Sequence, residues 1–350
     1  MTKTLHQRLL PAAILGLVMF LGSTLPHTAA AQNRASDDAL PDDVRNFKQR
    51  VVCEEGTYTS CQWCIRGIVM METLKEKHGD SFIGIAVHHG YADPMRDKAY
   101  DEEYASLNPG GFPKCIFNRN PSFKCDPKNG SVYANAALRN AKVSVGVGVE
   151  AQLEADSSTV SITTTTYFAT AANDAGYKLS YVLIENNVHD TIPSYNQYNG
   201  YADSGTDMGG YENMPSTIPA KDMYYQDVAR GFFGPFNGIE GSLPDNIPAL
   251  TPLTHDYTIT LPKSVREINN VELVALLIDA DGQIANAAKT KLTPKADDGG
   301  ATGLTQPAKK ATNITETARY NAAGQRVAAS QKGLTIIRMS DGSTRKVMTR

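Results

Sequence analysis

The amino-acid sequence predicts an α/β domain near residues 44–141, followed by an all-β sandwich near residues 142–294. In the first segment, apolar positions switch between the two-residue period of strands and the longer period of helices. At Lys142 the pattern changes to valines at every second position, and the strand-like segments that follow include no convincing helix. With 350 residues, of which 41% are hydrophobic, the chain can bury cores of both kinds.

Strands and helices are expected to alternate along the α/β segment. Side chains of a strand point to alternate faces, so Val51, Cys53 and Glu55 share one face of the first strand. Gly79 ends the first helix. The expected elements are strands over Arg50–Glu55, Ser81–His88 and Gly110–Phe117, a turn over Asn118–Pro121 leading to a fourth strand, and helices over Cys64–His78, Asp97–Leu107 and Gly130–Ala141.

The all-β segment begins with the alternating valines of residues 143–149. A long insertion over residues 187–250 is rich in Gly, Pro, Asn and Tyr, and loops of this length are usually functional or disordered. Its aromatic side chains favour either a ligand-binding platform or packing around the sandwich, and both readings stay open. The further expected strands are Val160–Thr166, Lys178–Glu185, Asp256–Leu261, Val271–Asp279 and Gln283–Leu292.

Both ends of the chain carry segments outside these domains. Two basic residues, an apolar run and then three alanines at residues 29–31 predict a secretory signal peptide over residues 1–31 that is cut after Ala31. A flexible leader over residues 32–43 follows. A linker over residues 295–313 precedes a basic tail over residues 314–350, which holds seven bases and two acids. Export permits lasting disulfides, and no transmembrane span is expected.

The charge and histidine patterns argue against two classes of function. There are 34 basic and 37 acidic residues, so no uniform basic field is available to bind nucleic acid. His88 and His89 end one strand and point to opposite faces, so they cannot easily share a metal ion. We therefore expect no metal site, no cofactor and no nucleic-acid partner.

Chemistry concentrates at Cys61-Gln62-Trp63-Cys64, a C-x-x-C motif placed between a strand and the start of a helix. A helix N-terminus favours a thiolate, which makes Cys61 the nucleophile and Cys64 the resolving thiol. The same spacing is also half of a zinc site, but no second C-x-x-C or well-spaced histidine pair completes one. The motif therefore predicts a redox dithiol.

Residues outside the motif complete the expected site. Glu55, on the strand before the dithiol, is a candidate to relay the proton of the resolving thiol. Alternatively, Glu54 and Glu55 are solvated charges at a strand end. Pro113 enters a strand after two glycines, which is typical of a cis-proline turn. Trp63 and Phe112, which lie beside the dithiol and this proline in the sequence, are the expected substrate-binding residues.

The three other cysteines fall around a predicted hairpin. Cys115 and Cys125 lie symmetrically about Asn120, so they face each other across the turn and can form a structural disulfide. The alternative is two separate buried thiols. Cys53 remains, and it is expected to be inert packing.

These motifs resemble thioredoxin-like domains, and they are most similar to the 28-kilodalton outer membrane protein family of gut and oral Gram-negative anaerobes. The likeness is strong at residues 51–67 and 111–114, continues loosely at residues 181–185, 227–231 and 286–287, and covers about residues 47–293. It implies a thioredoxin-like domain followed by an immunoglobulin-like β-sandwich, with Pro113 as the cis-proline that faces the dithiol. In the family, proline usually follows the second cysteine, and tryptophan and glycine flank the first. In this chain Ile65 follows the second cysteine, and Ser60 and Gln62 flank the first.

The basic tail has a resemblance of its own. Residues 320–327, 332–337 and 345–347 resemble the C-terminal sorting domain of type IX secretion. This implies that the secretion and sorting machinery is a partner and that the destination is the outer membrane or cell surface, with the periplasm as the alternative. Otherwise the tail is a small β-hairpin that packs on the sandwich.

Two functions therefore remain in view. The first is thiol-disulfide exchange, or redox-dependent handling of exported partner proteins, at the cell envelope. The second is a non-enzymatic surface protein, for binding or structure, with a static Cys61–Cys64 disulfide.

Overall fold

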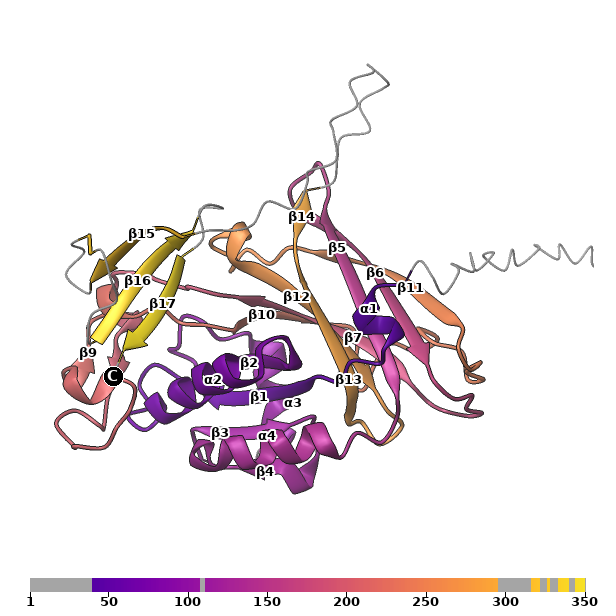
Figure 1. The fold of residues 1–350 in the computed structure, drawn as a ribbon, viewed down its shortest axis with the longest axis horizontal. Coiled ribbons are helices and arrows are strands. Elements are labelled where there is room, and N and C mark those ends of the chain that lie inside the picture. Colours follow the sequence, from indigo (N-terminus) through magenta and orange to yellow (C-terminus); the bar gives the residue numbers. More distant parts are fainter. Residues whose placement is uncertain are drawn as a thin grey trace, which may run out of the picture. The chain divides into compact units, whose positions relative to one another are not determined.

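The computed structural model describes residues 40–107, 111–294, 316–321, 326–327, 333–339 and 344–349. The chain divides into two compact units, Met1–Ala296 and Asp297–Arg350. The prediction of a mixed α/β chain with extensive β-sheet is confirmed (Figure 1). The predicted signal peptide and linker lie outside the described residues. Leu40 and Val44, at the end of the predicted leader, are buried in one cluster with Tyr167.

One eight-stranded sheet runs through the first unit in the order β13-β12-β7-β10-β2-β1-β3-β4. This sheet contains strands from both sides of residue 141. The division of the chain at that residue into an α/β domain and a β-sandwich remains a prediction. Strands β1, β2 and β10 are parallel, and the other neighbours are antiparallel. The strands are β1 (Val51–Thr57), β2 (Phe82–His88), β3 (Lys114–Phe117), β4 (Lys124–Cys125), β7 (Lys178–Glu185), β10 (Val228–Phe233), β12 (Val271–Ile278) and β13 (Ile284–Lys291).

A four-stranded sheet in the order β11-β6-β5-β14 packs against part of the first sheet. Its strands are β5 (Val145–Leu153), β6 (Thr159–Phe168), β11 (Pro252–Thr260) and β14 (Thr293–Pro294). Val147 and Ile162 from this sheet share a buried cluster with Leu183 and Leu273 from the larger one. The strands predicted for the all-β segment are therefore present: β6 alternates between buried and more exposed residues, whereas β7 and β12 are short runs that are buried almost throughout. The immunoglobulin-like assignment remains a prediction.

Helices cover both faces of the larger sheet around β1 (Figure 1). Helices α2 (Ile65–His78) and α4 (Gly130–Arg139) pack on one face, where Leu74 and Ala134 contact the cluster that contains Val51. Helix α3 (Lys98–Leu107) packs on the other face through Tyr100 and Tyr104. A short helix α1 (Asp42–Arg45) precedes β1. Among the described residues, no helix has the length and apolar character that crossing a membrane requires.

Strand β10 corrects the sequence prediction, which treated residues 187–250 as one insertion. Its residues Val228–Phe233 lie inside the larger sheet, between β2 and β7. Arg230 and Gly231 interrupt the apolar run that would have marked a strand, and the pairing with β7 shifts between Ala229 and Gly231. Arg230 is buried here because its Nε donates to Glu185 at 2.7 Å. The rest of the insertion holds the hairpin of β8 (Gln197–Tyr198) and β9 (Thr217–Ile218).

The tail forms a unit of its own. Strands β15 (Glu316–Asn321), β16 (Gly333–Met339) and β17 (Thr344–Thr349) make one antiparallel sheet. The prediction of a small β element at this end of the chain agrees with these strands.

Candidate functional site

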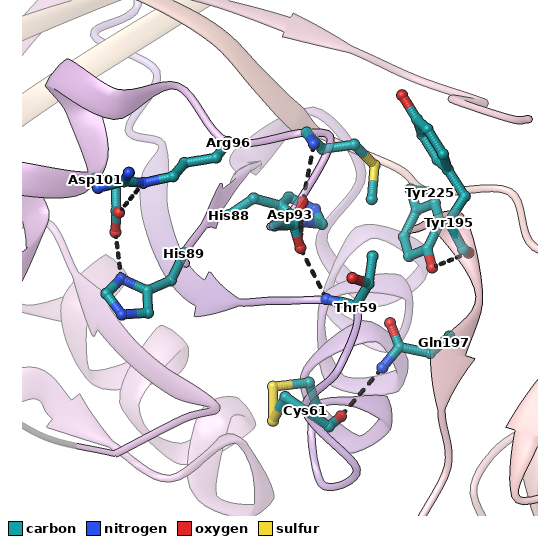
Figure 2. Close-up of polar contacts among 12 residues, drawn as sticks. Thr59, Cys61, His88, His89, Asp93, Arg96, Asp101, Tyr195, Gln197 and Tyr225 are labelled. Carbon is teal, nitrogen blue, oxygen red and sulfur yellow. Dashed lines mark hydrogen bonds and ion pairs between the residues drawn. A yellow bond between two sulfur atoms is a disulfide. The ribbon is translucent and has the colours of Figure 1, made fainter. Parts of the chain in front are cut away.

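The dithiol lies where β1 gives way to α2. Cys61 and Cys64 form a disulfide, with their Cα atoms 5.3 Å apart (Figure 2). The Cys64 amide donates to the Cys61 carbonyl at 3.1 Å, and the Gly67 amide donates to the Cys64 carbonyl at 2.9 Å. Cys61 is 5% exposed and Cys64 is fully buried. The motif therefore occupies the helix N-terminus that the sequence predicts, with Cys61 as the more accessible sulfur.

Glu55 lies beneath this first helical turn. Its side chain is buried, and its Oε1 has no hydrogen-bond partner among the described residues. A Cβ atom built on Gly67 would come 2.1 Å from Glu55 Oε1 and 3.3 Å from Pro113 Cβ, so the carboxyl group lies between β1 and the helix. Burial raises the pKa of Glu55 well above its ordinary value, although Thr57 and Arg66 act in the opposite direction. The alternative of solvated charges at a strand end is wrong.

The neighbouring Glu54 points to the opposite face and has a different role. It accepts hydrogen bonds from Tyr100 at 2.6 Å and from Arg119 at 2.9 Å, and all three side chains are buried. Arg119 also lies 3.6 Å from the ring centre of Phe236. Glu54 is thus a satisfied ion-pair residue, whereas Glu55 has an unsatisfied oxygen.

The Pro113 loop lies beside the first turn of α2 and carries an aromatic side chain. The Phe112–Pro113 peptide bond is cis, and Gly111 before it has φ of 84°. Phe112 stacks on His89 with ring centres 4.6 Å apart and meets Tyr58 edge-on at 5.2 Å. His89 is held by Asp101, whose oxygen lies 2.8 Å from its Nδ1. These rings make a partly exposed platform beside the loop.

A buried carboxylate fixes the residues that lead into the motif. Asp93 accepts from the amide of Thr59 and from the amide of Met95, each at 2.8 Å, and its oxygens lie 3.1 Å from His88 Nδ1 (Figure 2). Burial alone would raise the pKa of Asp93, but His88 and these two amides lower it below its usual value. His88 and His89 therefore face two different carboxylates. No cluster of potential metal ligands exists among the described residues.

The insertion contacts the dithiol from another direction. Tyr198 donates its amide to the Thr59 carbonyl at 2.8 Å, and Gly200 donates its amide to the Gln62 carbonyl at 2.7 Å. The Gln197 side chain donates to the Cys61 carbonyl at 3.1 Å. Trp63 meets Tyr201 edge-on at 5.4 Å and remains 44% exposed.

The tyrosines of the insertion divide between the two roles that the sequence left open. Tyr195 and Tyr225 are buried in an apolar cluster that the insertion shares with Ile65 of α2 and with Met95, and Tyr201 and Tyr211 pack against it. Tyr198 and Tyr224 are exposed. Packing therefore explains most of these rings.

The remaining cysteines lie behind the site, on the face of the sheet that α2 covers. Cys115 and Cys125 are directly opposite in the β3–β4 pair, as their symmetry about the turn predicts. Both are free thiols here, as is Cys53, so the Cys115–Cys125 disulfide remains a prediction. Burial raises the pKa of all three, to about 12 for Cys125. Such thiols are poor nucleophiles.

The structure thus places Glu55 and Pro113 beside Gly67, in the first turn of the helix that follows Cys61 and Cys64; their joint role as one site remains a prediction. It adds residues that the sequence did not single out for this site: Asp93, Asp101, Gln197, Tyr198, Gly200 and Tyr201. Only the tyrosines had a compositional signal.

Comparisons with known proteins give one family and several similar structures. The family model of outer membrane protein Omp28 matches residues 97–296. The solved structure of HBP35 of Porphyromonas gingivalis is similar at 15% identity and a TM-score of 0.49, over 86% of this chain and 98% of that one. A domain of the outer membrane lipoprotein Omp28 from Porphyromonas gingivalis is similar at 13% identity and a TM-score of 0.24, over 44% and 93%. No curated protein matches the chain.

Proposed function

This chain belongs to the outer membrane protein Omp28 family and therefore lies at the outer membrane or the cell surface, where we propose that it exchanges disulfides with exported partner proteins through Cys61 and Cys64. The observation that carries the proposal is Glu55, a buried carboxyl with an unpartnered oxygen beneath the turn that holds the disulfide. Leaving a buried polar group without a hydrogen bond costs about 1–3 kcal/mol. A disulfide that never opens does not require a buried carboxyl beside it, whereas reaction of the Cys64 thiol requires a proton acceptor.

The surroundings of the dithiol support a thioredoxin-like site. The motif lies at a helix N-terminus, and the first turn of that helix contains no acidic residue. A cis-proline follows Phe112, which with Trp63 offers partly exposed aromatic surface for a partner. The helix dipole and free amides at this end favour a thiolate on Cys61. These features resemble thioredoxin-like domains and make Cys61 the attacking sulfur.

The exchange conserves atoms and electrons. From the reduced pair, the Cys61 thiolate attacks a partner disulfide, a Cys61–partner disulfide forms, and one partner thiolate leaves and takes up a proton. Cys64 then transfers its proton to Glu55, and its thiolate attacks the Cys61 sulfur and releases the second partner thiolate. The partner disulfide gains the two electrons that the dithiol loses. Its two thiolates take up two protons: one balances the proton that Cys61 had already released to solvent, and the other balances the Cys64 proton, which Glu55 gives back. A partner dithiol drives the same steps in reverse, and no cofactor takes part.

The reduction potential of the pair tests this proposal against the static surface protein. An exchanging pair is expected above about −300 mV, whereas a structural disulfide lies below it. The mature chain is equilibrated with glutathione mixtures, free thiols are alkylated, and the peptide that contains Cys61 and Cys64 is quantified by mass spectrometry. Cleavage after Glu55 and Glu72 gives a peptide without Cys53, which keeps the three buried thiols out of the measurement. A potential below −300 mV would favour the static disulfide and refute the exchange.

The tail is proposed to act as the sorting signal. Residues 297–350 form a separate unit, and the dithiol, Glu55 and the Pro113 loop all belong to the first. Deleting Ile314–Arg350 is expected to leave the melting temperature of the first unit unchanged and to retain the protein in the periplasm, because a signal peptide carries a chain only across the inner membrane. Cell fractionation and melting curves of both forms check this. Normal surface delivery of the shortened chain contradicts it, as does a loss of thermal stability.

A further inference from the structure

The segment of the dithiol loop from Thr59 to Gln62 has its carbonyl groups taken by the insertion. Within four residues, the carbonyls of Thr59, Cys61 and Gln62 accept hydrogen bonds from Tyr198, Gln197 and Gly200 respectively. In a loop without this cover, such carbonyls would face water. The insertion therefore fixes the backbone on both sides of the nucleophilic cysteine.

Gln197 is the central contact of this set. Gln197 is 1% exposed, and its side chain donates to the Cys61 carbonyl at 3.1 Å (Figure 2). It also donates to the Tyr198 carbonyl at 3.0 Å. One amide group thus links the insertion backbone to the carbonyl of the cysteine itself. Since the Cys64 amide also donates to this carbonyl, Gln197 acts on the same turn that spaces the two sulfurs.

Gly200 makes the second contact, through shape as well as hydrogen bonding. A Cβ at this position would lie 3.0 Å from two carbons of the Trp63 ring and 3.1 Å from the Gln62 carbonyl oxygen. The absent side chain lets the insertion backbone lie directly against the two residues between the cysteines. Asp93 holds the amide of Thr59 from the other side, so the loop is fixed between two separate elements.

We propose that Gln197 is a positioning residue for the Cys61–Cys64 pair, and that the insertion holds the loop in the geometry in which the disulfide closes. The inference rests on the proposed exchange function. Two thiols held near their bonded arrangement have a high effective concentration, which stabilises the disulfide relative to the dithiol. Releasing the loop lowers that concentration and makes the disulfide easier to reduce.

Gln197→Met is the direct test, because methionine has a similar length and cannot donate a hydrogen bond. It is expected to shift the redox equilibrium toward the dithiol by about tenfold, which corresponds to about 30 mV. Gly200→Ala is the independent second variant: it leaves Gln197 intact, its φ is not in the left-handed region, and the same direction of shift is expected. Gln226→Met is the matched control, since Gln226 bonds to Asn187 within the insertion.

The measurement uses the mature chain and the alkylation assay on the peptide that contains both cysteines, with dithiothreitol replacing glutathione if the wild-type pair is strongly reducing. A purely structural role for Gln197 would lower the melting temperature and leave the potential unchanged. Equal potentials for wild type, Gln197→Met and Gly200→Ala, or an equal shift in Gln226→Met, overturn the positioning role. A wild-type potential below −300 mV would refute the exchange function instead, and the comparison between variants would still stand.

Discussion

Cys64→Ser is expected to accumulate covalent complexes with exported partner proteins, and Cys61→Ser is expected to abolish them. Cys61 is the more exposed cysteine of the pair and precedes the helix N-terminus, so its thiolate is expected to form the bond to the partner. Resolution of that bond needs the second thiol, which serine cannot replace. Non-reducing electrophoresis of cell-envelope fractions, after rapid acid quenching and alkylation, measures the complexes directly.

Cys125→Ser provides the matched control for both variants. Cys125 is a free thiol at the far side of β3, and its pKa is raised to about 12. When Cys125→Ser is combined with Cys64→Ser, neither the amount nor the identity of the covalent complexes should change. Equal trapping by Cys61→Ser and Cys64→Ser would contradict the assigned roles. Loss of trapping with Cys125→Ser would show that Cys125, rather than Cys61, reacts with the partner.

Features that depend on residues close in sequence were predictable. The helix that starts after Cys64 and ends at Gly79 follows from apolar spacing and a glycine with positive φ. The opposition of Cys115 and Cys125 follows from their equal spacing around one turn. Each of these needs only local periodicity or turn chemistry.

The state of Glu55 shows where local reasoning stops. Strand alternation correctly puts Glu54 and Glu55 on opposite faces, but it leaves their burial undecided. Burial follows because β1 lies between β2 and β3, with α2 on one face and α3 on the other. Arg119 then satisfies the carboxylate of Glu54, and no described residue makes a comparable contact with Oε1 of Glu55.

The contribution of the insertion was not predictable from its sequence. Strand β8 is two residues long, so it has no period to read, and Gln197 is 136 positions away from the Cys61 carbonyl that it contacts. Strand β10 has only six residues, and Arg230 and Gly231 interrupt its apolar pattern. Such contacts are set by tertiary packing, which a single sequence does not encode in any local pattern.

Glu55→Gln is expected to stabilise the protein above about pH 5 and to slow disulfide exchange. Burial raises the pKa of Glu55 above its ordinary value of 4.5, so the folded state favours the protonated form. Below that value the carboxyl is neutral in both states, so its ionisation does not affect the free energy of unfolding. As pH rises toward the folded pKa, the unfolded state ionises more readily and the free energy of unfolding falls, by about 1.4 kcal/mol for each unit of pKa shift. Glutamine does not ionise, so Glu55→Gln avoids this decrease in the free energy of unfolding.

The same substitution removes the proton acceptor for Cys64. General-base groups contribute about 10²–10⁴-fold to rate, so the Cys61–partner disulfide should persist longer in Glu55→Gln. Urea unfolding from pH 4 to pH 8 and stopped-flow oxidation of the reduced protein measure the two effects.

Glu54→Gln is the control that separates this behaviour from ordinary burial, because it changes the adjacent residue on the opposite face. It leaves Arg119 buried without its carboxylate and should destabilise the fold by about 3–5 kcal/mol. Since Glu54 contacts Arg119 and Tyr100 rather than the dithiol turn, the rate of resolution should be preserved in molecules that remain folded. A gain in stability together with a loss of exchange rate is therefore specific to Glu55. If Glu55→Gln instead destabilises the protein at pH 8, or leaves the lifetime of the mixed disulfide unchanged, the carboxyl is not the proton acceptor of this dithiol.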